Sequence, residues 1–421
     1  MRVVQLNCVF GHGSTGKIVE AIHRHLVSEG DESYVLYGYG PDSSDPCAIR
    51  VVPPVVRKAQ SLRSRVTGFP YGGALWGTRA TINELKALRP DVAHIHCFNA
   101  YIANIYSILS YLKSEGIPTI ITNHAEFMYT GGCTHALQCE KWLYGCGGCE
   151  RIGKEHPISW FFDRTHKEWE LLKEAYDGFD NLTVCCVSDW VRERAAQSPF
   201  FKGRQVLTVL NGLDPFTFRY RSNQSLREDL AAGRRKVIMH VTPDFSSPIK
   251  GGRYVLAMAE RMPDVSFVIV GDRGGAKSEL KNVRFVGRAN DQTRLAEYYS
   301  AADICLLTSE RETYSMVTAE SLCCGTPVVG FRAGGPESIA ITDYSDFVQQ
   351  GSIDELEHAL KRTLDAPINK QELSSTACSL YGEHKMCSRY RELYQASVEG
   401  RPVVIGLGEP VVTLGGNRYV S

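Results

Sequence analysis

Two carboxylates, Glu312 and Glu320, are separated by seven residues within the segment 310–331, ERETYSMVTAESLCCGTPVVGF. The order of residue types there predicts a loop, a short helix and then a buried strand. Thr313 or Ser315 can cap the start of the helix, because short hydroxyl side chains accept hydrogen bonds from first-turn N–H groups. The Gly-Thr-Pro that follows marks the end of the helix. The segment therefore places two acidic side chains around one helix.

The N-terminus of that helix predicts a phosphate site. Its N–H groups near Ser315, Met316 and Val317 have no partner within the helix and carry the positive end of the helix dipole. Glu312 and Glu320 repel phosphate, but their oxygens accept hydrogen bonds from the hydroxyls of a sugar or a ribose. A nucleotide-sugar site needs hydrogen-bond donors for its phosphates, flanked by hydrogen-bond acceptors for its hydroxyl groups.

The same segment resembles the donor-site motif of retaining GT-B glycosyltransferases, which reads Glu, seven residues, Glu. The resemblance includes Gly-Thr-Pro-Val-Val after Glu320 and Gly-Gly-Pro-Glu at 334–337, and it extends over most of residues 1–395. It implies an α/β GT-B fold with two Rossmann-like parallel-sheet domains facing across a cleft. It further implies that Tyr314 lies in the donor site, that Glu320 holds ribose hydroxyls and that Glu312 holds a hydroxyl of the transferred sugar.

Lys250 follows a strand-like run and a Pro-containing loop, HVTPDFSSPIKGG. It resembles the Lys-Gly element whose lysine faces the donor diphosphate in this family, where a cation stabilises the charge that grows on the leaving group. The alternative is an ordinary solvated loop lysine. The family also places an arginine a few residues earlier, where this chain has Thr-Pro-Asp at 242–244. Arg253 or Arg288 would have to supply that charge.

A glycine-rich stretch, 11–17, follows the first strand-like run and reads Gly-His-Gly-Ser-Thr-Gly-Lys. It has the glycines and lysine of a P-loop, but Ile18 stands where Ser or Thr would bind magnesium, which argues against an ATP site. A glycine loop that approaches donor phosphate through its N–H groups is favoured, and a simple strand-to-helix turn is the alternative. The predicted donor contacts in this loop are Gly13, Ser14, Thr15 and Gly16.

His124 follows the strand-like run PTIITN, and ligands of parallel sheets lie beyond the carboxyl ends of strands. In the family a histidine at this place reaches toward the donor sugar with an acidic residue close behind, which Glu126 matches loosely. We therefore count His124 with Glu312 and Lys250 as the candidate catalytic residues. A structural histidine is the alternative. His94 and His96, which alternate along another strand, are interpreted as packed strand residues.

Four cysteines, Cys133, Cys139, Cys146 and Cys149, form the pattern C-x5-C-x6-C-x2-C among glycines. Four thiolates can satisfy tetrahedral zinc, although these spacings are wider than in most zinc ribbons. Free buried thiols and disulfides are the alternatives. A similar insert, here spanning 131–150, occurs in some capsule and exopolysaccharide glycosyltransferases. Zinc at these cysteines would be structural, and the resemblance implies no cofactor or divalent cation for catalysis.

The stretch 55–69, VVRKAQSLRSRVTGF, carries four basic residues among apolar ones. It predicts a basic amphipathic element that lies on an anionic membrane surface, where a lipid-linked acceptor resides. A solvated helix face is the alternative.

The bulk composition limits the other function classes. Formal net charge is zero, which argues against nucleic acid as a partner because phosphate contacts need a basic excess. No apolar run approaches the roughly 20 residues of a membrane span. The chain opens directly on a strand-like run, not on a signal peptide. Scattered cysteines favour a reducing compartment. We therefore expect a cytoplasmic protein, peripheral on the inner face of the membrane.

Strand and helix patterns alternate in two series, which predicts two parallel sheets. The chain as a whole is expected to have three regions. Residues 1–212 would form an N-terminal acceptor domain, 213–378 a donor domain, and 379–421 a late helix that crosses back to the first domain in this family, with a tail that has no assigned role.

The resemblance implies a retaining glycosyltransferase that moves a hexose from a nucleotide diphosphate sugar, of UDP or GDP type, to a saccharide or lipid-linked acceptor in cell-surface polysaccharide or glycolipid biosynthesis. A sugar-nucleotide epimerase of the same fold and a non-catalytic nucleotide-sugar-binding subunit are the alternatives.

Overall fold

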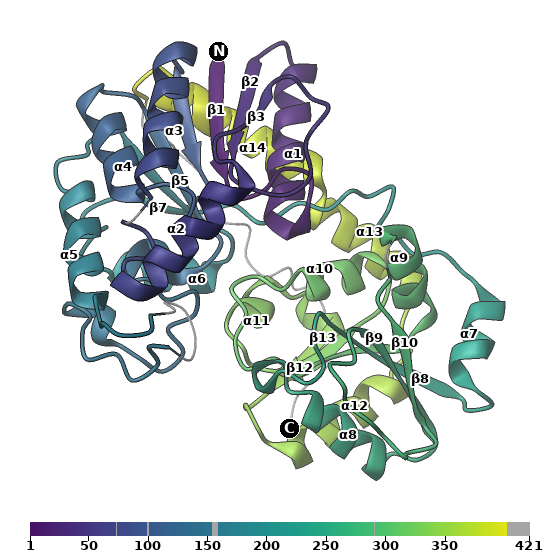
Figure 1. Ribbon diagram of the computed structural model, residues 1–421. Coiled ribbons are helices and arrows are strands. Elements are labelled where there is room, and N and C mark those ends of the chain that lie inside the picture. The colour runs from purple at the N-terminus through teal and green to yellow at the C-terminus, as the bar shows by residue number, and fades with distance from the viewer. Residues whose placement is uncertain (73, 99–100, 154–158, 290, 402–421) are drawn as a thin grey trace. The chain divides into compact units, whose positions relative to one another are not determined.

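The computed structural model describes residues 1–72, 74–98, 101–153, 159–289 and 291–401. They divide into two compact units (Figure 1). The first holds Met1–Leu210 and the residues from Met386 to the end of the described chain, and the second holds Asn211–Lys385. The tail beyond residue 401 lies outside the described residues.

A seven-stranded sheet of order β3-β2-β1-β4-β5-β6-β7 forms the centre of the first unit, and every pairing in it is parallel. Its strands are β1 (Arg2–Asn7), β2 (Glu32–Tyr37), β3 (Ala48–Arg50), β4 (Val92–Ile95), β5 (Thr119–Asn123), β6 (Leu182–Cys186) and β7 (Val206–Thr208). The helices are α1 (Gly13–Ser28), α2 (Pro54–Thr67), α3 (Leu75–Leu88), α4 (Ile105–Ser114), α5 (Thr165–Tyr176) and α6 (Asp189–Gln197), with 3-10 turns η1 (Glu126–Tyr129) and η2 (Lys141–Leu143).

The second unit has a six-stranded parallel sheet of order β10-β9-β8-β11-β12-β13. Its strands are β8 (Lys236–Thr242), β9 (Val265–Gly271), β10 (Val283–Gly287), β11 (Ile304–Leu307), β12 (Val328–Phe331) and β13 (Ser345–Val348). Its helices are α7 (Gln224–Ala231), α8 (Gly252–Arg261), α9 (Gln292–Ala301), α10 (Met316–Cys323), α11 (Gly335–Ile339), α12 (Ile353–Asp365) and α13 (Lys370–Tyr381), with 3-10 turns η3 (Pro248–Lys250) and η4 (Thr342–Tyr344). The predicted fold class, two parallel-sheet α/β units, is confirmed.

Strand order reverses once in each sheet, between β1 and β4 in the first unit and between β8 and β11 in the second. Because right-handed crossovers send the helices on either side of that point to opposite faces, ligands of such sheets bind beyond the carboxyl ends of these strands. The loops that follow β1 and β4, and those that follow β8 and β11, are therefore the places to look for a site.

The late helix predicted to begin at residue 379 is interrupted, and this part of the prediction is wrong. Helix α13 ends at Tyr381, and α14 (Glu383–Val398) begins two residues later. At the break, Leu213 N–H donates to the Tyr381 carbonyl at 2.7 Å, and Glu383 N–H donates to the Leu213 carbonyl at 2.8 Å. Pairing with a distant strand-like residue replaces the local helical bonds, so sequence periodicity alone gives no sign of it.

Helix α14 packs into the core of the first unit. Tyr390, Leu393 and Tyr394 join a cluster with residues of β1, β4, β5 and β6. The Tyr394 hydroxyl lies 2.6 Å from His94 Nδ1, and the Tyr390 hydroxyl lies 3.0 Å from Thr122 Oγ1. The C-terminal helix thus supplies hydroxyl partners to polar groups that are buried within the N-terminal sheet.

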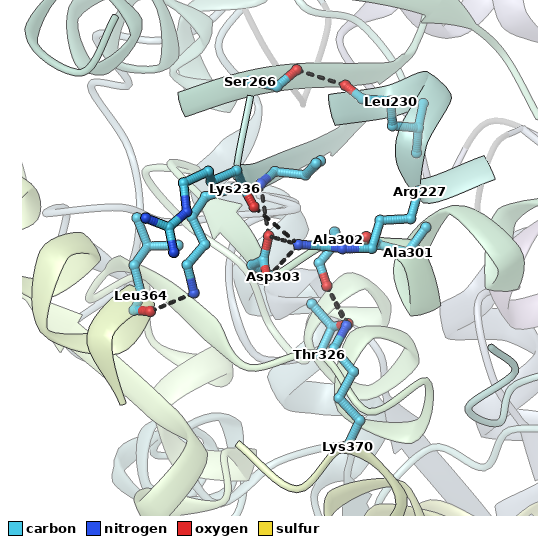
Figure 2. Close-up of polar contacts among 12 residues, drawn as sticks. Arg227, Leu230, Lys236, Ser266, Ala301, Ala302, Asp303, Thr326, Leu364 and Lys370 are labelled. Atoms are coloured by element: carbon cyan, nitrogen blue, oxygen red, sulfur yellow. Dashed lines mark hydrogen bonds and ion pairs between the residues drawn. The ribbon is translucent and has the colours of Figure 1, made fainter. Parts of the chain in front are cut away.

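The amino ends of the second sheet are held by a polar network (Figure 2). The Asp303 carboxylate accepts from Val237 N–H at 2.7 Å and from Arg227 Nη2 at 3.0 Å. Lys370 Nζ donates to the Ser300 carbonyl at 2.9 Å, and burial lowers the pKa of this lysine to about 8. These charges satisfy backbone groups at the edge opposite the carboxyl ends of the strands, so we assign them to scaffolding.

Candidate active site

The loops after β8 and β11 are bonded to each other, which positions Lys250. The Thr308 hydroxyl donates to the Lys250 carbonyl at 2.9 Å, and Glu310 N–H donates to the Ile249 carbonyl at 2.8 Å. Gly251 has a φ of +68°, and a Cβ there would lie 2.2 Å from the Thr308 carbonyl oxygen. Only glycine fits that position, so the glycine of the Lys-Gly pair is a geometric requirement of these two loops.

Lys250 and Glu312, predicted on separate motifs, form an ion pair with 2.6 Å between Nζ and Oε1. Both side chains are about four-fifths buried, with 23% and 20% of their surface exposed. The backbone of Glu312 is fixed as well, because its N–H donates to the Ala333 carbonyl at 3.0 Å and its carbonyl accepts from Gly335 N–H at 2.9 Å. A cation and a carboxylate therefore stand together beside the start of α10.

Ser315 is the N-cap of α10. Its Oγ accepts from Thr318 N–H at 3.2 Å, and its backbone is left-handed with a φ of 77°. Of the two predicted caps, Ser315 is thus the one used. The first-turn N–H groups of Met316 and Val317 have no acceptor within an α-helix, which leaves them available to an anion.

Glu320 lies one turn further along α10 and is half-buried. Its Oε2 accepts from the Tyr299 hydroxyl of α9 at 3.0 Å, which orients the carboxylate. Nothing in the sequence around Tyr299 pointed to this role.

Tyr314 is different from the other predicted donor contacts, because its ring is buried and its hydroxyl donates to the Asn211 carbonyl at 2.7 Å. The side chain of Tyr314 thus has a structural role in the interior of this unit.

Arg288 is the one of the two candidate arginines that contacts the loop after β8. Its Nη2 lies 3.4 Å from the Pro243 carbonyl and 2.8 Å from Asp272 Oδ2. Arg253 instead lies over the ring of Tyr254, 4.8 Å from its centroid. Arg288 is therefore close to residues 242–244, where the family motif has an arginine that this chain lacks.

In the first unit, helix α1 begins at Gly13, so the predicted loop 11–17 is shorter than expected. Gly11 and Gly13 have φ angles of 69° and 62°, in the left-handed region that favours glycine. Gly16 is required for packing, since a Cβ there would lie 2.9 Å from Val9 Cγ2. Ser14 is exposed in the first turn, where N–H groups have no acceptor within the helix.

His124 stands at the end of β5 in a buried chain of polar groups. Its Nε2 lies 3.1 Å from His96 Nδ1, and His96 Nε2 lies 3.2 Å from Gln5 Oε1. The Gln5 amide nitrogen donates to the Val19 carbonyl at 3.3 Å, which fixes Oε1 as the acceptor facing His96. A neutral His96 must then donate through Nε2 and accept through Nδ1, so His124 carries its proton on Nε2. His124 Nδ1 is consequently an acceptor.

Burial keeps this histidine group neutral. Desolvation lowers the pKa of His124 to about 4 and holds the pKa values of His94 and His96 well below their usual range, with further lowering of both by neighbouring histidines. In the unfolded chain each pKa returns to about 6.5. Between about pH 6.5 and 4 the unfolded chain therefore binds protons that the native chain does not, and this part of the stability, fully present above pH 6.5, is lost as pH falls.

We expect the free energy of unfolding to fall by up to about 1.4 kcal/mol per pH unit for each such histidine over that window. Urea unfolding between pH 7 and 4.5 measures the slope. In His124→Asn one titrating group is gone, so the slope should be shallower than in the parent protein. Equal slopes in the two proteins would contradict a neutral, buried His124.

Glu126 has a structural role, contrary to the expectation that it follows His124 into the site. It is fully buried, and Arg194 Nε lies 2.8 Å from its Oε1. The Tyr129 hydroxyl and Ala136 N–H also donate to its carboxylate, at 3.1 and 2.7 Å. Glu126 therefore anchors the start of the cysteine-rich insert.

All fourteen cysteines lie within the described residues as free thiols. Burial raises the pKa of Cys133 to about 12 and that of Cys146 to about 11, and the other thiols of the insert add to this rise for both. No group of three or more His, Cys, Asp or Glu side chains in the described residues is arranged to hold a metal ion. Structural zinc at Cys133, Cys139, Cys146 and Cys149 stays a prediction.

No helix in the described part of the chain combines the length and the apolar character that crossing a membrane requires.

Two family models match successive parts of the chain. Residues 15–215 match Glycosyltransferase Family 4, and residues 235–366 match Glycosyl transferases group 1. D-inositol 3-phosphate glycosyltransferase 2 of Catenulispora acidiphila is 33% identical over 121 residues, 28% of this chain and 28% of that protein. N-acetyl-alpha-D-glucosaminyl L-malate synthase of Bacillus anthracis is 24% identical over 208 residues, 45% and 54% of the two chains. The matched regions thus span between about a quarter and a half of these curated relatives.

Solved structures share the fold over nearly the whole chain. Sucrose-phosphate synthase from Thermosynechococcus elongatus has a TM-score of 0.65 at 15% identity, over 95% of this chain and 100% of that one. Anabaena HepE in complex with UDP-glucose has a TM-score of 0.58 at 14% identity, over 94% and 100%. Glycosyltransferase models thus match part of each unit, and the chain shares the GT-B fold of these solved structures.

Proposed function

We propose that this protein is a retaining glycosyltransferase that moves a hexose from a nucleotide diphosphate sugar to a saccharide or lipid-linked acceptor in cell-surface glycan synthesis. The observation that carries the proposal is the start of α10, where first-turn N–H groups, the Lys250–Glu312 pair and Glu320 lie together in one unit. Positive groups that suit a diphosphate are thus flanked by carboxylates that suit hydroxyls.

Each residue of this cluster has a role in the proposal. Lys250 and the α10 N-terminus hold the diphosphate and stabilise the negative charge that it gains as the glycosidic bond breaks. Glu320, oriented by Tyr299, accepts from the ribose hydroxyls, and Glu312 accepts from a hydroxyl of the transferred sugar. The leaving phosphate assists deprotonation of the acceptor, so neither glutamate serves as a nucleophile. Arg288 provides the additional positive charge near the loop after β8.

Similar proteins support a UDP-sugar as the donor and leave a choice of acceptor. HepE is described in complex with UDP and with UDP-glucose, and other relatives are named for inositol phosphate and malate acceptors. Incubating the protein with UDP-, GDP- and ADP-sugars, with and without candidate acceptors, tests the proposal. Acceptor-dependent release of nucleotide with the sugar in a new glycoside supports it. Nucleotide release with a free, epimerised sugar would instead establish the epimerase alternative.

Glu320→Ala should lower kcat/KM for the donor at least about tenfold, because it removes one charge-assisted contact to the ribose, worth about 1.5–3 kcal/mol. Tyr299→Phe should give a smaller loss, since it frees the carboxylate without removing it. Glu260→Ala, on the exposed face of α8, is the control and should retain the parent rate. Steady-state kinetics with the best donor measures all three, and a parent-like Glu320→Ala would remove this residue from the site.

A further inference from the structure

Helix α2 presents its apolar residues to solvent and buries polar ones. Val55, Leu62 and Val66 are 78%, 55% and 38% exposed. They stand at positions i, i+7 and i+11, which share one side of a helix. The buried residues of α2 are Gln60 and Ser64. This is the reverse of the usual surface helix, whose apolar stripe faces the core.

The reversed orientation is fixed by a buried contact. The Gln60 amide nitrogen donates to the Tyr101 carbonyl at 3.0 Å. The left-handed Gly68 ends the helix tightly, since a Cβ there would lie 2.6 Å from the Phe162 carbonyl oxygen. Turning α2 so that its apolar stripe faced inward would break the hydrogen bond from Gln60 to Tyr101. It would also separate Gly68 from Phe162. The stripe is therefore a built feature of the surface.

An aromatic segment lies against the end of α2 and extends this surface. Trp160, Phe161 and Phe162 are 52%, 69% and 50% exposed. Trp160 N–H donates to the Arg65 carbonyl at 2.8 Å, which fastens the segment to the helix. Arg164 lies over the ring of Phe162 at 5.3 Å. We call the α2 stripe together with Trp160–Phe162 the apolar face.

The apolar face is bordered by positive charge. Between Asp45 and Glu84 the chain has six basic residues and no acidic one, and four of the six lie on α2. Asp163, the acid next to the aromatic segment, accepts from Cys149 N–H at 2.7 Å and from Thr165. Beside the face is a hollow of about 370 Å³ that two arginines and two phenylalanines help to line. Its lining is Arg63, Thr67, Phe69, Gly72, Phe162 and Arg164.

We propose that the apolar face docks on the surface of an anionic lipid bilayer. The stripe and the aromatic rings enter the boundary between headgroups and acyl chains, and the basic side chains meet lipid phosphates. Exposed aromatic residues beside arginines, with an apolar helix side parallel to the surface, match that boundary in both polarity and charge. The inference does not depend on the proposed reaction, because none of these residues belongs to the α10 cluster.

Co-sedimentation of the full chain with vesicles tests the proposal. Binding to vesicles of phosphatidylglycerol and phosphatidylcholine should exceed binding to phosphatidylcholine alone at least about tenfold, and it should weaken in high salt because exposed charges are screened. Leu62→Ser with Trp160→Ser should lower the affinity about tenfold or more, and Lys58→Glu with Arg63→Glu should abolish the preference for anionic vesicles.

The matched controls lie in the second unit. Phe216→Ser removes an aromatic side chain that is 77% exposed, and Lys277→Glu reverses an exposed charge. Both should bind vesicles as the parent does, and circular dichroism should show that all the variants are folded. Equal binding to neutral and anionic vesicles, an absence of binding, or parent-like binding by Leu62→Ser with Trp160→Ser would overturn the proposal. Association with acidic proteins but not with vesicles would do so as well.

Discussion

Replacing Lys250 by alanine should lower the rate of sugar transfer at least about tenfold, with a larger effect on kcat than on KM. A charge-assisted contact is worth about 1.5–3 kcal/mol, or about ten- to a hundredfold in rate. The loss falls on kcat because the charge on the leaving diphosphate grows as the bond breaks. Removing Lys250 also leaves Glu312, now 2.6 Å from that ammonium, without its counter-ion, and the bare carboxylate then repels the diphosphate.

Two further variants separate these effects. Lys250→Ala with Glu312→Gln removes the repulsion, so it should recover part of the loss in donor affinity but not the loss in kcat. Lys361→Ala is the control, because Lys361 also pairs with a glutamate, Glu357, at 2.6 Å but stands on the exposed side of α12. A Lys250→Ala enzyme with the kinetics of the Lys361→Ala enzyme would show that the loop lysine is solvated scaffolding.

The alternation of strand and helix signals was sufficient to predict the fold class. The strand-like run expected before Lys250 is observed as β8, Lys236–Thr242. The cap of α10 was narrowed to two residues, one of which, Ser315, is used. These features succeed because they depend on local periodicity and on contacts within a few residues, which the sequence displays directly.

Features that depend on distant contacts were not predicted. The break between α13 and α14 depends on Leu213, more than 160 residues earlier in the chain. Tyr299 acquires a partner only when α9 packs beside α10. Gln5 gave a weak signal, as a polar residue within a buried strand, but its effect on the His124 tautomer requires the register that places β1 beside β4. The reversed α2 appeared in the sequence only as a basic amphipathic stretch, because periodicity does not tell which side of a helix faces the core.

Glu126→Ala should be among the most destabilising single changes in the first unit, at about 3–5 kcal/mol. The carboxylate is fully buried and is bonded to Arg194, to the Tyr129 hydroxyl and to Ala136 N–H. Alanine removes all three bonds and leaves a guanidinium, only 20% exposed, without its anion. Chemical unfolding at pH 7 measures the change. Because the proposed donor site is in the other unit, any loss of transfer should follow the loss of folded protein.

A double-mutant cycle shows whether the ion pair causes that loss. Arg194→Met alone leaves Glu126 buried without a cation and should also be costly, whereas Glu126→Ala with Arg194→Met removes both charges and should lose less than the sum of the two single changes. Glu170→Ala, at a surface pair with Lys167 at 3.4 Å, should change stability by no more than about 0.5 kcal/mol. Additive losses in the cycle would mean that Glu126 acts through packing and its backbone contact to Ala136, and not through charge.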